Sequence, residues 1–510
     1  MATDKTSSKM AQHILRNAKR ATGGSAWDCV RALHLRSSIH QGGLNGTLEQ
    51  WQDTLTGFYA QSHRLGITAG GEGFDGVLPW SQDSAGYPRR EENGDAEEAA
   101  ANSAYRTCLA WWYPERRGAK LEYVGRSPDG AEPCHVVRLT PDGGRPFDLW
   151  INRATALMAR TVEVGAFETV TRCFSDYRAV GGVRMPFHIR TGNGHTKYDQ
   201  ECEVQWAELN PPGSEVHLRM PPPPAPDFWV AGGRNSVEIP FRQAGNLILV
   251  DVSVDGKGTL PFILDTGGVN LVTPEAAQEL GLEPQGEFRG FGGGEGSVDM
   301  QAAAVSSLEF GGIHLLDQVV WVYPFPALKE ALGIADFGGL LGYEVFRRFV
   351  VQVDYQRRQL TLTRPECFAH KAGGTVVPFC FHGNIPEVEG ALDGVPGKFD
   401  LDTGNTGALI LNTPFVERHG LVARYGATEM NTGEGAGGGA VSFLIAQASG
   451  LRLESVEVKD LPIALSLHRS GALSNPYAAG LVGAGVFQRF RMTFDYSRQQ
   501  ITFDERDTAV

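Results

Sequence analysis

Two Asp-Thr-Gly tripeptides, 137 residues apart, have the residue types best suited to chemistry in this chain. Asp265-Thr266-Gly267 follows Phe262-Ile263-Leu264, and Asp402-Thr403-Gly404 follows Phe399-Asp400-Leu401. Two carboxylates about 4 Å apart repel by roughly 4 kcal/mol at an effective dielectric of about 20, so they share one proton near neutral or mildly acidic pH. One aspartate then takes a proton from a water molecule while the other donates one, which is general acid–base hydrolysis. We therefore predict Asp265 and Asp402 as a catalytic pair.

The surroundings of each copy carry this prediction, because a lone Asp-Thr-Gly is also a reasonable turn at a strand end. Downstream of each copy lies an apolar run that ends in glycine, at residues 338–342 and 479–483. Residues 353–361 are then echoed by residues 494–502, 141 positions later. Three landmarks that recur in the same order at nearly one offset indicate an internal duplication.

Each copy also contains a glycine-rich segment, at residues 289–296 and 432–439. With these segments, residues 235–505 resemble the retropepsin-like aspartic peptidases, in a single-chain form in which two fused lobes replace the usual homodimer. The resemblance implies an active site formed within one chain, and a flap from each lobe that closes over an extended polypeptide substrate. The predicted flap and substrate-binding residues are Gly290, Phe291, Gly292, Gly293, Gly435 and Gly437.

Four residues next to the aspartates are predicted to support the pair. Gly267 and Gly404 permit the sharp turn that brings each carboxylate to the interface between the lobes. Thr266 and Thr403 are placed to exchange hydrogen bonds across that interface. The family commonly has Ala or Ser after the tripeptide, whereas this chain has Gly268 and Asn405.

Other acidic residues near the motifs are given non-catalytic interpretations. Asp400 shares a strand face with Asp402, and we expect it to lie in solvent rather than beside the pair. Asp354 and Asp495 are expected to be solvated or salt-bridged. The glycine-rich segments lack the Gly-Lys-Ser/Thr ending of a phosphate-binding loop, and neither Cys-x-x-Cys nor His-Glu-x-x-His occurs. No metal and no cofactor are expected.

Composition places the chain among ordinary globular proteins, with 42% hydrophobic and 21% charged residues in 510. A net charge of −13 without a basic stripe argues against nucleic acid as a partner, and no apolar run is long enough for a membrane span.

The seven cysteines leave at least one thiol unpaired, and Cys367 with Cys380 is one conceivable disulfide. The start has no secretory signal, so the expected location is the bacterial periplasm if a signal was removed, or otherwise the cytoplasm.

The N-terminal half is predicted to form an antiparallel sheet with helices packed against it. Helices are predicted over residues 8–20 and 95–112, and strands over 119–124, 135–139 and 147–151. Further hairpins follow through residues 167–206. Particularly over residues 158–189, this half resembles the lipoprotein-carrier half-barrel of the bacterial envelope, a fold that curls around an apolar ligand or partner. His135, His188 and the aromatic residues 111–113 are interpreted as packing residues.

The sequence thus predicts a mainly β protein with an N-terminal α+β domain containing a curved antiparallel sheet, followed by two tandem acid-protease lobes. The predicted boundaries are 1–210 for the first domain, 211–233 for a proline-rich linker, 234–366 for lobe 1 and 367–510 for lobe 2. The predicted function is an aspartic endopeptidase. Two alternatives stay open: a peptidase fold used for binding or for non-proteolytic acid–base chemistry, and a hydrophobic-ligand carrier acting through the N-terminal domain.

Overall fold

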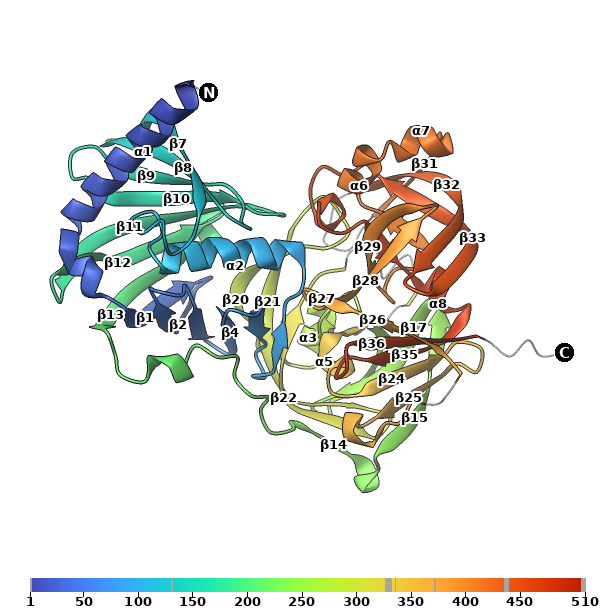
Figure 1. The fold of residues 1–510 in the computed structure, drawn as a ribbon. Helices are drawn as coiled ribbons and strands as arrows, with labels where there is room; N and C mark the ends of the chain where they lie inside the picture. Colours follow the sequence, from blue (N-terminus) through green and yellow to red (C-terminus); the bar gives the residue numbers. More distant parts are fainter. Residues whose placement is uncertain are drawn as a thin grey trace. The chain divides into compact units, whose positions relative to one another are not determined.

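The computed structural model describes residues 2–129, 132–325, 333–334, 336–370, 373–434 and 440–505. The chain divides into two compact units, Met1–Pro224 and Ala225–Val510. Strands dominate both units, in large sheets (Figure 1). The predicted fold class, mainly β with an N-terminal α+β part, is confirmed.

Unit 1 is built on one thirteen-stranded sheet in the order β6-β5-β4-β3-β2-β1-β13-β12-β11-β10-β9-β8-β7. Every neighbouring pair is antiparallel, and β1 joins the two halves by pairing with β13. The strands are β1 Ala32–Gln41, β2 Leu44–Asp53, β3 Tyr59–Leu65, β4 Thr68–Phe74, β5 Pro79–Gln82, β6 Pro88–Arg90, β7 Ala119–Asp129, β8 Glu132–Pro141, β9 Phe147–Asn152, β10 Met158–Val164, β11 Thr169–Val180, β12 Val183–Gly192 and β13 Gln200–Leu209.

Two helices lie against this sheet (Figure 1). Helix α1 spans Ala2–Ala21 and packs along β7, and α2 spans Gly94–Thr107 and contacts β4, β5 and β8. Asn93 starts α2 because its side chain accepts a hydrogen bond from the amide of Ala96. Both predicted helices are therefore present, although α2 ends at Thr107 rather than at residue 112. Leu15, Tyr105 and Leu149 belong to the apolar core between the helices and the sheet.

Unit 2 contains two sheets with the same strand order, one around each Asp-Thr-Gly. The first has β17-β18-β23-β19-β22 in its path, and the second has β28-β29-β34-β30-β33. In each, a hairpin follows, β20–β21 in the first and β31–β32 in the second. The first set is β16 Arg242–Ala244, β17 Leu247–Val254, β18 Thr259–Leu264, β19 Leu271–Val272, β20 Gln285–Gly290, β21 Val298–Phe310, β22 Ile313–Val322 and β23 Gly339–Leu341. The second is β27 Cys380–His382, β28 Ile385–Leu392, β29 Val395–Leu401, β30 Leu409–Leu411, β31 Glu429–Glu434, β32 Ala440–Leu453, β33 Val456–Ser466 and β34 Gly480–Val482.

A six-stranded sheet, in the order β15-β25-β24-β35-β36-β26, joins the two regions. Its central pair is antiparallel, with Val351 opposite Phe494 and Val353 opposite Met492. The strands are β15 Ser236–Pro240, β24 Val350–Asp354, β25 Gln359–Thr363, β26 Thr375–Pro378, β35 Phe490–Asp495 and β36 Gln500–Glu505. The short helices of unit 2 are α3 Pro274–Glu279, α5 Tyr343–Phe346, α6 Thr413–Arg418, α7 Leu421–Tyr425 and α8 Ala484–Phe487.

The end of the predicted linker at residues 211–233 is structured. β14 Phe228–Val230 pairs with β22 at a sheet edge, and Asp227 forms an ion pair with the buried Arg348. This strand was not predicted from the sequence, because it follows a proline-rich stretch and contains too few apolar residues to show a period. Near the start of the same stretch, His217 stacks on Trp51 at 3.9 Å.

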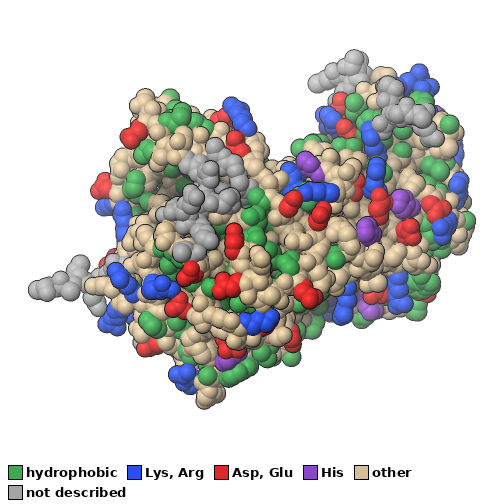
Figure 2. Space-filling model, turned by 180° about the vertical axis from the view of Figure 1, so that it is seen from behind, with side chains coloured by type: hydrophobic (Ala, Val, Ile, Leu, Met, Phe, Trp, Pro, Cys, Tyr) green, Lys and Arg blue, Asp and Glu red, His purple; other side chains and the backbone are tan. Residues whose placement is uncertain are grey.

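All seven cysteines lie in the described ranges and none of them forms a disulfide, so Cys367 and Cys380 are not bridged. None of the helices that the structure describes combines the length and the apolar composition needed to cross a lipid bilayer. On the face drawn in Figure 2, basic and acidic side chains are interspersed.

Candidate active site

Two strands of matching geometry deliver the two aspartates. β18 ends one residue before Asp265, and β29 ends one residue before Asp402. Each strand pairs in parallel with a short buried strand, β23 or β34. The amide of Asp265 donates to the carbonyl of Leu341 at 2.9 Å, and the amide of Asp402 donates to that of Val482 at 2.9 Å. The backbone of both aspartates is therefore fixed by the sheet.

The two threonines form a reciprocal set of hydrogen bonds between the two regions. The amide of Thr266 donates to Oγ1 of Thr403 at 2.9 Å, and the amide of Thr403 donates to Oγ1 of Thr266 at 2.9 Å. Each hydroxyl then donates across the interface, Thr266 to the carbonyl of Leu401 at 2.7 Å and Thr403 to that of Leu264 at 2.9 Å. Both threonines are buried, so this lattice holds the two turns in register.

The glycines of the two motifs face the opposite aspartate. A Cβ added at Gly267 would stand 2.5 Å from Oδ1 of Asp402, and one added at Gly404 would stand 2.6 Å from Oδ1 of Asp265. Both distances are well inside van der Waals contact. Close approach across the interface, more than an unusual backbone angle, therefore requires glycine at these two positions.

The two carboxyl groups are hydrogen-bonded to each other, with Asp265 only 9% exposed. Burial raises the pKa of Asp265, but the hydrogen bonds from Asp402 and from the amides of Gly267 and Gly404 oppose that rise. Burial raises the pKa of Asp402 well above its usual range, and the charge of Asp265 raises it further. The raised pKa values and the hydrogen bond between the two carboxyl groups indicate that the pair shares one proton.

Aromatic side chains close the space behind the pair. Tyr496 contacts Phe346, Phe379 and Phe381, with ring centroids 5.3 to 5.4 Å apart. Burial raises the pKa of the Tyr496 hydroxyl, with further contributions from Tyr343 and the two aspartates. A neutral, apolar wall of this kind lowers the local dielectric and strengthens the electrostatic coupling between the carboxyl groups.

The first predicted flap is a hairpin whose turn contacts the other region. Gly290 ends β20, and Phe291, Gly292 and Gly293 lie in the turn before β21. Oε1 of Glu295 accepts from the amide of Arg469 at 2.6 Å, and the Ser470 hydroxyl donates to the carbonyl of Glu295 at 2.8 Å. The second predicted flap, β31–β32, has its turn at residues 435–439, so Gly435 and Gly437 lie outside the described residues.

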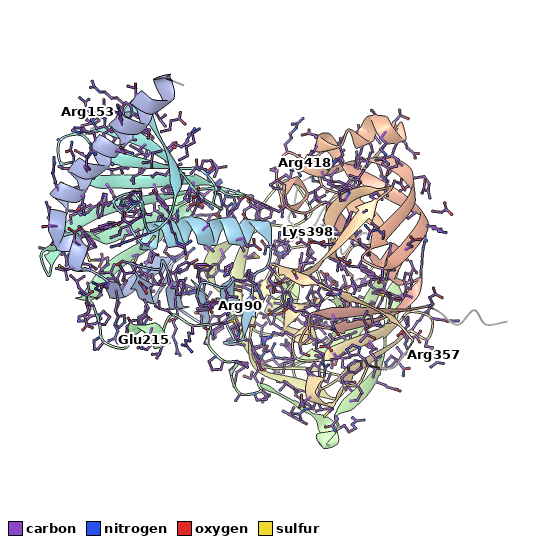
Figure 3. The ribbon with its side chains drawn as sticks, viewed as in Figure 1. Arg90, Arg153, Glu215, Arg357, Lys398 and Arg418 are labelled. Atoms are coloured by element: carbon purple, nitrogen blue, oxygen red, sulfur yellow. The ribbon has the colours of Figure 1, made fainter. Side chains whose placement is uncertain are left out.

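Asp400 is buried, not solvated as we expected. Its side chain is 5% exposed and accepts from Nδ1 of His382 at 3.0 Å. Glu387 lies opposite it on β28, and Lys398, at 3.3 Å from Glu387, is labelled on β29 in Figure 3. The expectation was wrong because β29 continues to Leu401, which keeps Asp400 inside the sheet.

His382, Glu387 and Asp400 offer ligand atoms within 4.8 Å of one another, a spacing that a metal ion would accept. The hydrogen bonds do not fit an ion, however. The Asn475 amide oxygen accepts from the Tyr477 amide at 2.9 Å, so its nitrogen donates to Nε2 of His382 at 2.9 Å. Neutral His382 therefore carries its proton on Nδ1, where it bonds Asp400 instead of offering a lone pair.

Sequence reasoning missed this cluster, although a signal was present. Asp393-Gly394 is a typical two-residue hairpin turn, and it sets Leu392 opposite Val395. Counting back from that turn places Glu387 opposite Asp400. His382 and Asn475 come from elsewhere in the chain and carried no such signal.

Gly268 and Asn405, which depart from the family pattern, have different local roles. A Cβ at Gly268 would lie 3.1 Å from Oδ2 of Asp265, whereas Asn405 donates its amide to Asp402 at 3.2 Å. Asp354 and Asp495 end strands β24 and β35, and they were expected to be solvated or salt-bridged. Asp354 accepts from the amide of Arg357, which lies at a turn in Figure 3, and the buried Asp495 pairs with Arg498 at 2.6 Å.

Residues 250–345 match the family described as aspartyl protease. This range contains the first Asp-Thr-Gly, the first hairpin and Gly342. No curated protein matches the chain.

Solved structures similar to parts of the chain include an aspartic proteinase from Irpex lacteus, at 11% identity, covering 53% of this chain and 98% of that one with a TM-score of 0.37. A retropepsin-like aspartic protease from Rickettsia conorii is 15% identical and covers 26% of this chain and 89% of its own, with a TM-score of 0.19. A putative outer membrane lipoprotein-sorting protein domain from Vibrio parahaemolyticus is 11% identical, covering 42% of this chain and 100% of its own with a TM-score of 0.30.

Proposed function

We propose that the chain is an aspartic endopeptidase whose active site is assembled from the two Asp-Thr-Gly copies of one polypeptide. The hydrogen-bonded pair of Asp265 and Asp402, held by the reciprocal threonine lattice, is the observation that carries the proposal. The aspartyl protease family match over residues 250–345 supports it.

Hydrolysis in such a site follows from the protonation of the pair. The Asp265 carboxylate accepts a proton from a water molecule, and the water oxygen attacks the carbonyl carbon of the peptide bond. Asp402 donates its proton to the carbonyl oxygen, which gives a neutral tetrahedral diol. The diol then collapses as the C–N bond breaks, the departing nitrogen takes the proton held by Asp265, and Asp402 recovers a proton from the diol. No bond forms between protein and substrate.

The proposal extends to the organisation of the chain. Residues 234–366 and 367–510 are two lobes that arose by duplication, a view supported by their matching strand order. The β20–β21 and β31–β32 hairpins serve as flaps, one from each lobe. An extended polypeptide lies between them and the aspartates, with its backbone paired to the flap strands.

The test is cleavage of a peptide library between pH 4 and 7 by the full chain and by Asp265→Asn and Asp402→Asn. Each variant removes one of the two proton carriers, so we expect each to lose at least about 10³-fold in kcat/KM. Asp354→Asn is the matched control, because Asp354 is an aspartate of a surface turn, and it should retain full activity. Failure of the unsubstituted chain to cleave any peptide across this range would overturn the proposal, as would full activity of either active-site variant.

A further inference from the structure

The face of the unit 1 sheet that carries α2 is lined by polar side chains. An apolar ligand would need an apolar surface there. Cross-strand partners share a face of a sheet, and two rows of them face α2. One row crosses β10, β11, β12, β13 and β1 and consists of Thr161, Arg172, Thr191, Gln200 and Gln41. The other crosses β2 to β5 and consists of Gln50, Gln61, Glu72 and Ser81.

Contacts with α2 establish which face this is. Ser103 of α2 is hydrogen-bonded to Tyr59, which lies two residues before Gln61 on β3. Arg106 of α2 forms an ion pair of 2.7 Å with Glu163, which lies two residues after Thr161 on β10. Residues two apart on a strand point to the same side, so both rows face the helix.

The sheet is curved strongly enough to bring the two rows near each other. β4 and β11 are six steps apart in the strand order, which is roughly 29 Å in a flat sheet at about 4.8 Å per strand. Arg172 nevertheless interacts electrostatically with Glu72 and Tyr59. We call the surface formed by these rows, on the side of the sheet that carries α2, the inner face of unit 1.

Arg172 has no partner on this inner face. Within the part of the chain that the structure describes, its guanidinium makes no hydrogen bond and no ion pair, whereas Glu163 is already bound by Arg106 at 2.7 Å. Arg106 and Arg172 repel each other, and burial together with that repulsion lowers the pKa of Arg172. Arg172 is half-buried, so its guanidinium has lost part of its hydration without gaining a partner, and a bound carboxylate would compensate for this loss in two-point geometry.

Glu72 faces Arg172 without pairing with it. Gln61 donates to its carboxylate at 2.6 Å, and that amide accepts from Gln50 at 3.0 Å. Desolvation by the surrounding protein raises the pKa of Glu72, although its side chain is exposed. The Glu72 carboxylate is therefore accessible to a ligand.

We propose that the inner face of unit 1 binds a short peptide, with the free carboxylate on Arg172 and amide or amino groups on Glu72, Gln61 and Gln50. A cation at one wall, an anion at the other and carboxamides between them match the charges and hydrogen-bonding groups of a peptide end. A phosphate would meet repulsion from Glu72 and Glu163, and an acyl chain would leave these polar groups dehydrated without partners. The site is separate from the pair Asp265 and Asp402 and does not depend on its activity.

The probe is a mixed pool of tripeptides with free carboxyl ends, added to the full chain carrying Asp265→Asn so that no peptide is cleaved. Hydrogen exchange should show protection of β3–β4 and β10–β11. Arg172→Met should weaken the apparent affinity for the pool by at least about tenfold, because it removes a charge-assisted hydrogen-bond pair. Arg178→Met is the matched control, since Arg178 lies on the same strand with its side chain 58% exposed, and it should bind as before.

Two further arms make the outcome decisive. The same pool with amidated ends should bind as weakly to the unsubstituted Arg172 site as the free-carboxylate pool binds to Arg172→Met. If Arg172→Met does not fold, Arg172→Lys takes its place. This variant keeps the charge but lacks the two-point guanidinium geometry, so it should bind the free-carboxylate pool more weakly than the site with Arg172 does. Unchanged binding by Arg172→Lys and Arg172→Met would overturn the proposal. So would protection of the inner face by palmitate instead of peptides, or no protection by the free-carboxylate pool up to about 10 mM.

Discussion

The two Asp-Thr-Gly regions are alike at their aspartates and unlike one layer behind them. Both have the same strand order, the same parallel pairing and one half each of the threonine lattice. Behind Asp265, Ile263 lies opposite Leu249, and both are buried apolar residues. The equivalent pair behind Asp402 is Asp400 and Glu387, and both are buried as well.

This difference shows that the Asp-Thr-Gly motif specifies the turn but not the electrostatic environment of the aspartate. The first aspartate sits on an apolar layer, whereas the second lies two residues from a cluster of ionisable groups. Yet the hydrogen bonds that Asp265 receives from Gly267 and Gly404 already favour its charged form. Asp402 likewise accepts two amide hydrogen bonds, from Gly404 and Asn405, so the two carboxyl groups differ in the layer behind them rather than in the number of amides that they contact.

The largest expected effect comes from adding a methyl group at Gly267 or Gly404, the glycines that approach the opposite aspartate. These two substitutions test whether the two Asp-Thr-Gly turns are equivalent. Gly267→Ala should push Asp402 away, and Gly404→Ala should push Asp265 away, because each new Cβ would stand within 2.6 Å of the opposite carboxylate. Misplacement of either proton carrier by about 1 Å should lower kcat/KM by 10² to about 10³-fold. Steady-state cleavage of a peptide substrate measures the effect.

Gly258→Ala serves as the control, since its added Cβ would meet only Leu280 at 3.9 Å. It should leave kcat/KM unchanged. If one interface glycine tolerated alanine and the other did not, the two turns would not be equivalent, and the comparison would fail at its closest point.

A second test concerns stability rather than rate. Thr266→Val and Thr403→Val each remove a buried hydroxyl, which leaves the partner's amide and one carbonyl without hydrogen bonds. We expect each to lower the free energy of unfolding by about 2 to 4 kcal/mol, measured by urea denaturation. Thr406→Val, at an exposed position after the second motif, should change it by less than about 0.5 kcal/mol.

The double variant sharpens this test. Because the four hydrogen bonds form one lattice, the loss in Thr266→Val with Thr403→Val should be smaller than the sum of the single losses. Strict additivity would mean that the two threonines act independently, contrary to the reciprocal geometry.

Sequence reasoning reached the repeated elements because each carries a local signal. Asp-Thr-Gly, the apolar runs that end in Gly342 and Gly483, and the first hairpin all stand where their spacing placed them. The helices of unit 1 were predictable from their apolar period and from the Asn93 cap. These features depend on residues close together in the chain.

The features that could not be predicted depend on contacts between distant segments. β14 is only three residues long and gains its place from pairing with β22. Asn475 reaches His382 across 93 residues, and Arg172 meets Glu72 only because the sheet curves. Asp265 likewise accepts from one amide of each copy, Gly267 and Gly404, so inspection of one motif does not reveal the second contact.

The ionisable pair behind the second motif predicts a pH dependence that the first cannot produce. Burial and the charge of Asp400 raise the pKa of Glu387 to about 7, whereas in the unfolded chain it titrates near about 4.3. Between these values the folded protein keeps a proton that the unfolded chain has lost. The stabilisation is complete below about pH 4 and is lost as pH rises through about 7, amounting to roughly 3 to 4 kcal/mol.

Glu387→Gln should therefore flatten the curve of unfolding free energy against pH between about pH 5 and 8, because glutamine does not titrate. Glu389→Gln, on the same strand and exposed, should keep the wild-type slope. An unchanged slope in Glu387→Gln would show that the second region is as free of buried titration as the first.

The smallest expected effect concerns the β20–β21 hairpin, the proposed flap whose turn the structure describes. Glu295 connects this flap to the other region through the amide of Arg469, while two further contacts, from Ser470 to the carbonyl of Glu295 and from Ala472 to the carbonyl of Gly292, use only the flap backbone. Glu295→Ala removes the first and leaves the other two. An exposed hydrogen bond of this kind contributes about 0.5 to 1 kcal/mol, so flap closure should weaken and KM should rise about threefold, with kcat nearly constant.

Glu287→Ala, in the same hairpin and exposed, should leave KM unchanged. If Glu295→Ala instead lowered kcat with KM constant, the flap of the first region would contribute to the chemical step, and the division between a positioning layer and a reacting pair would have to be redrawn.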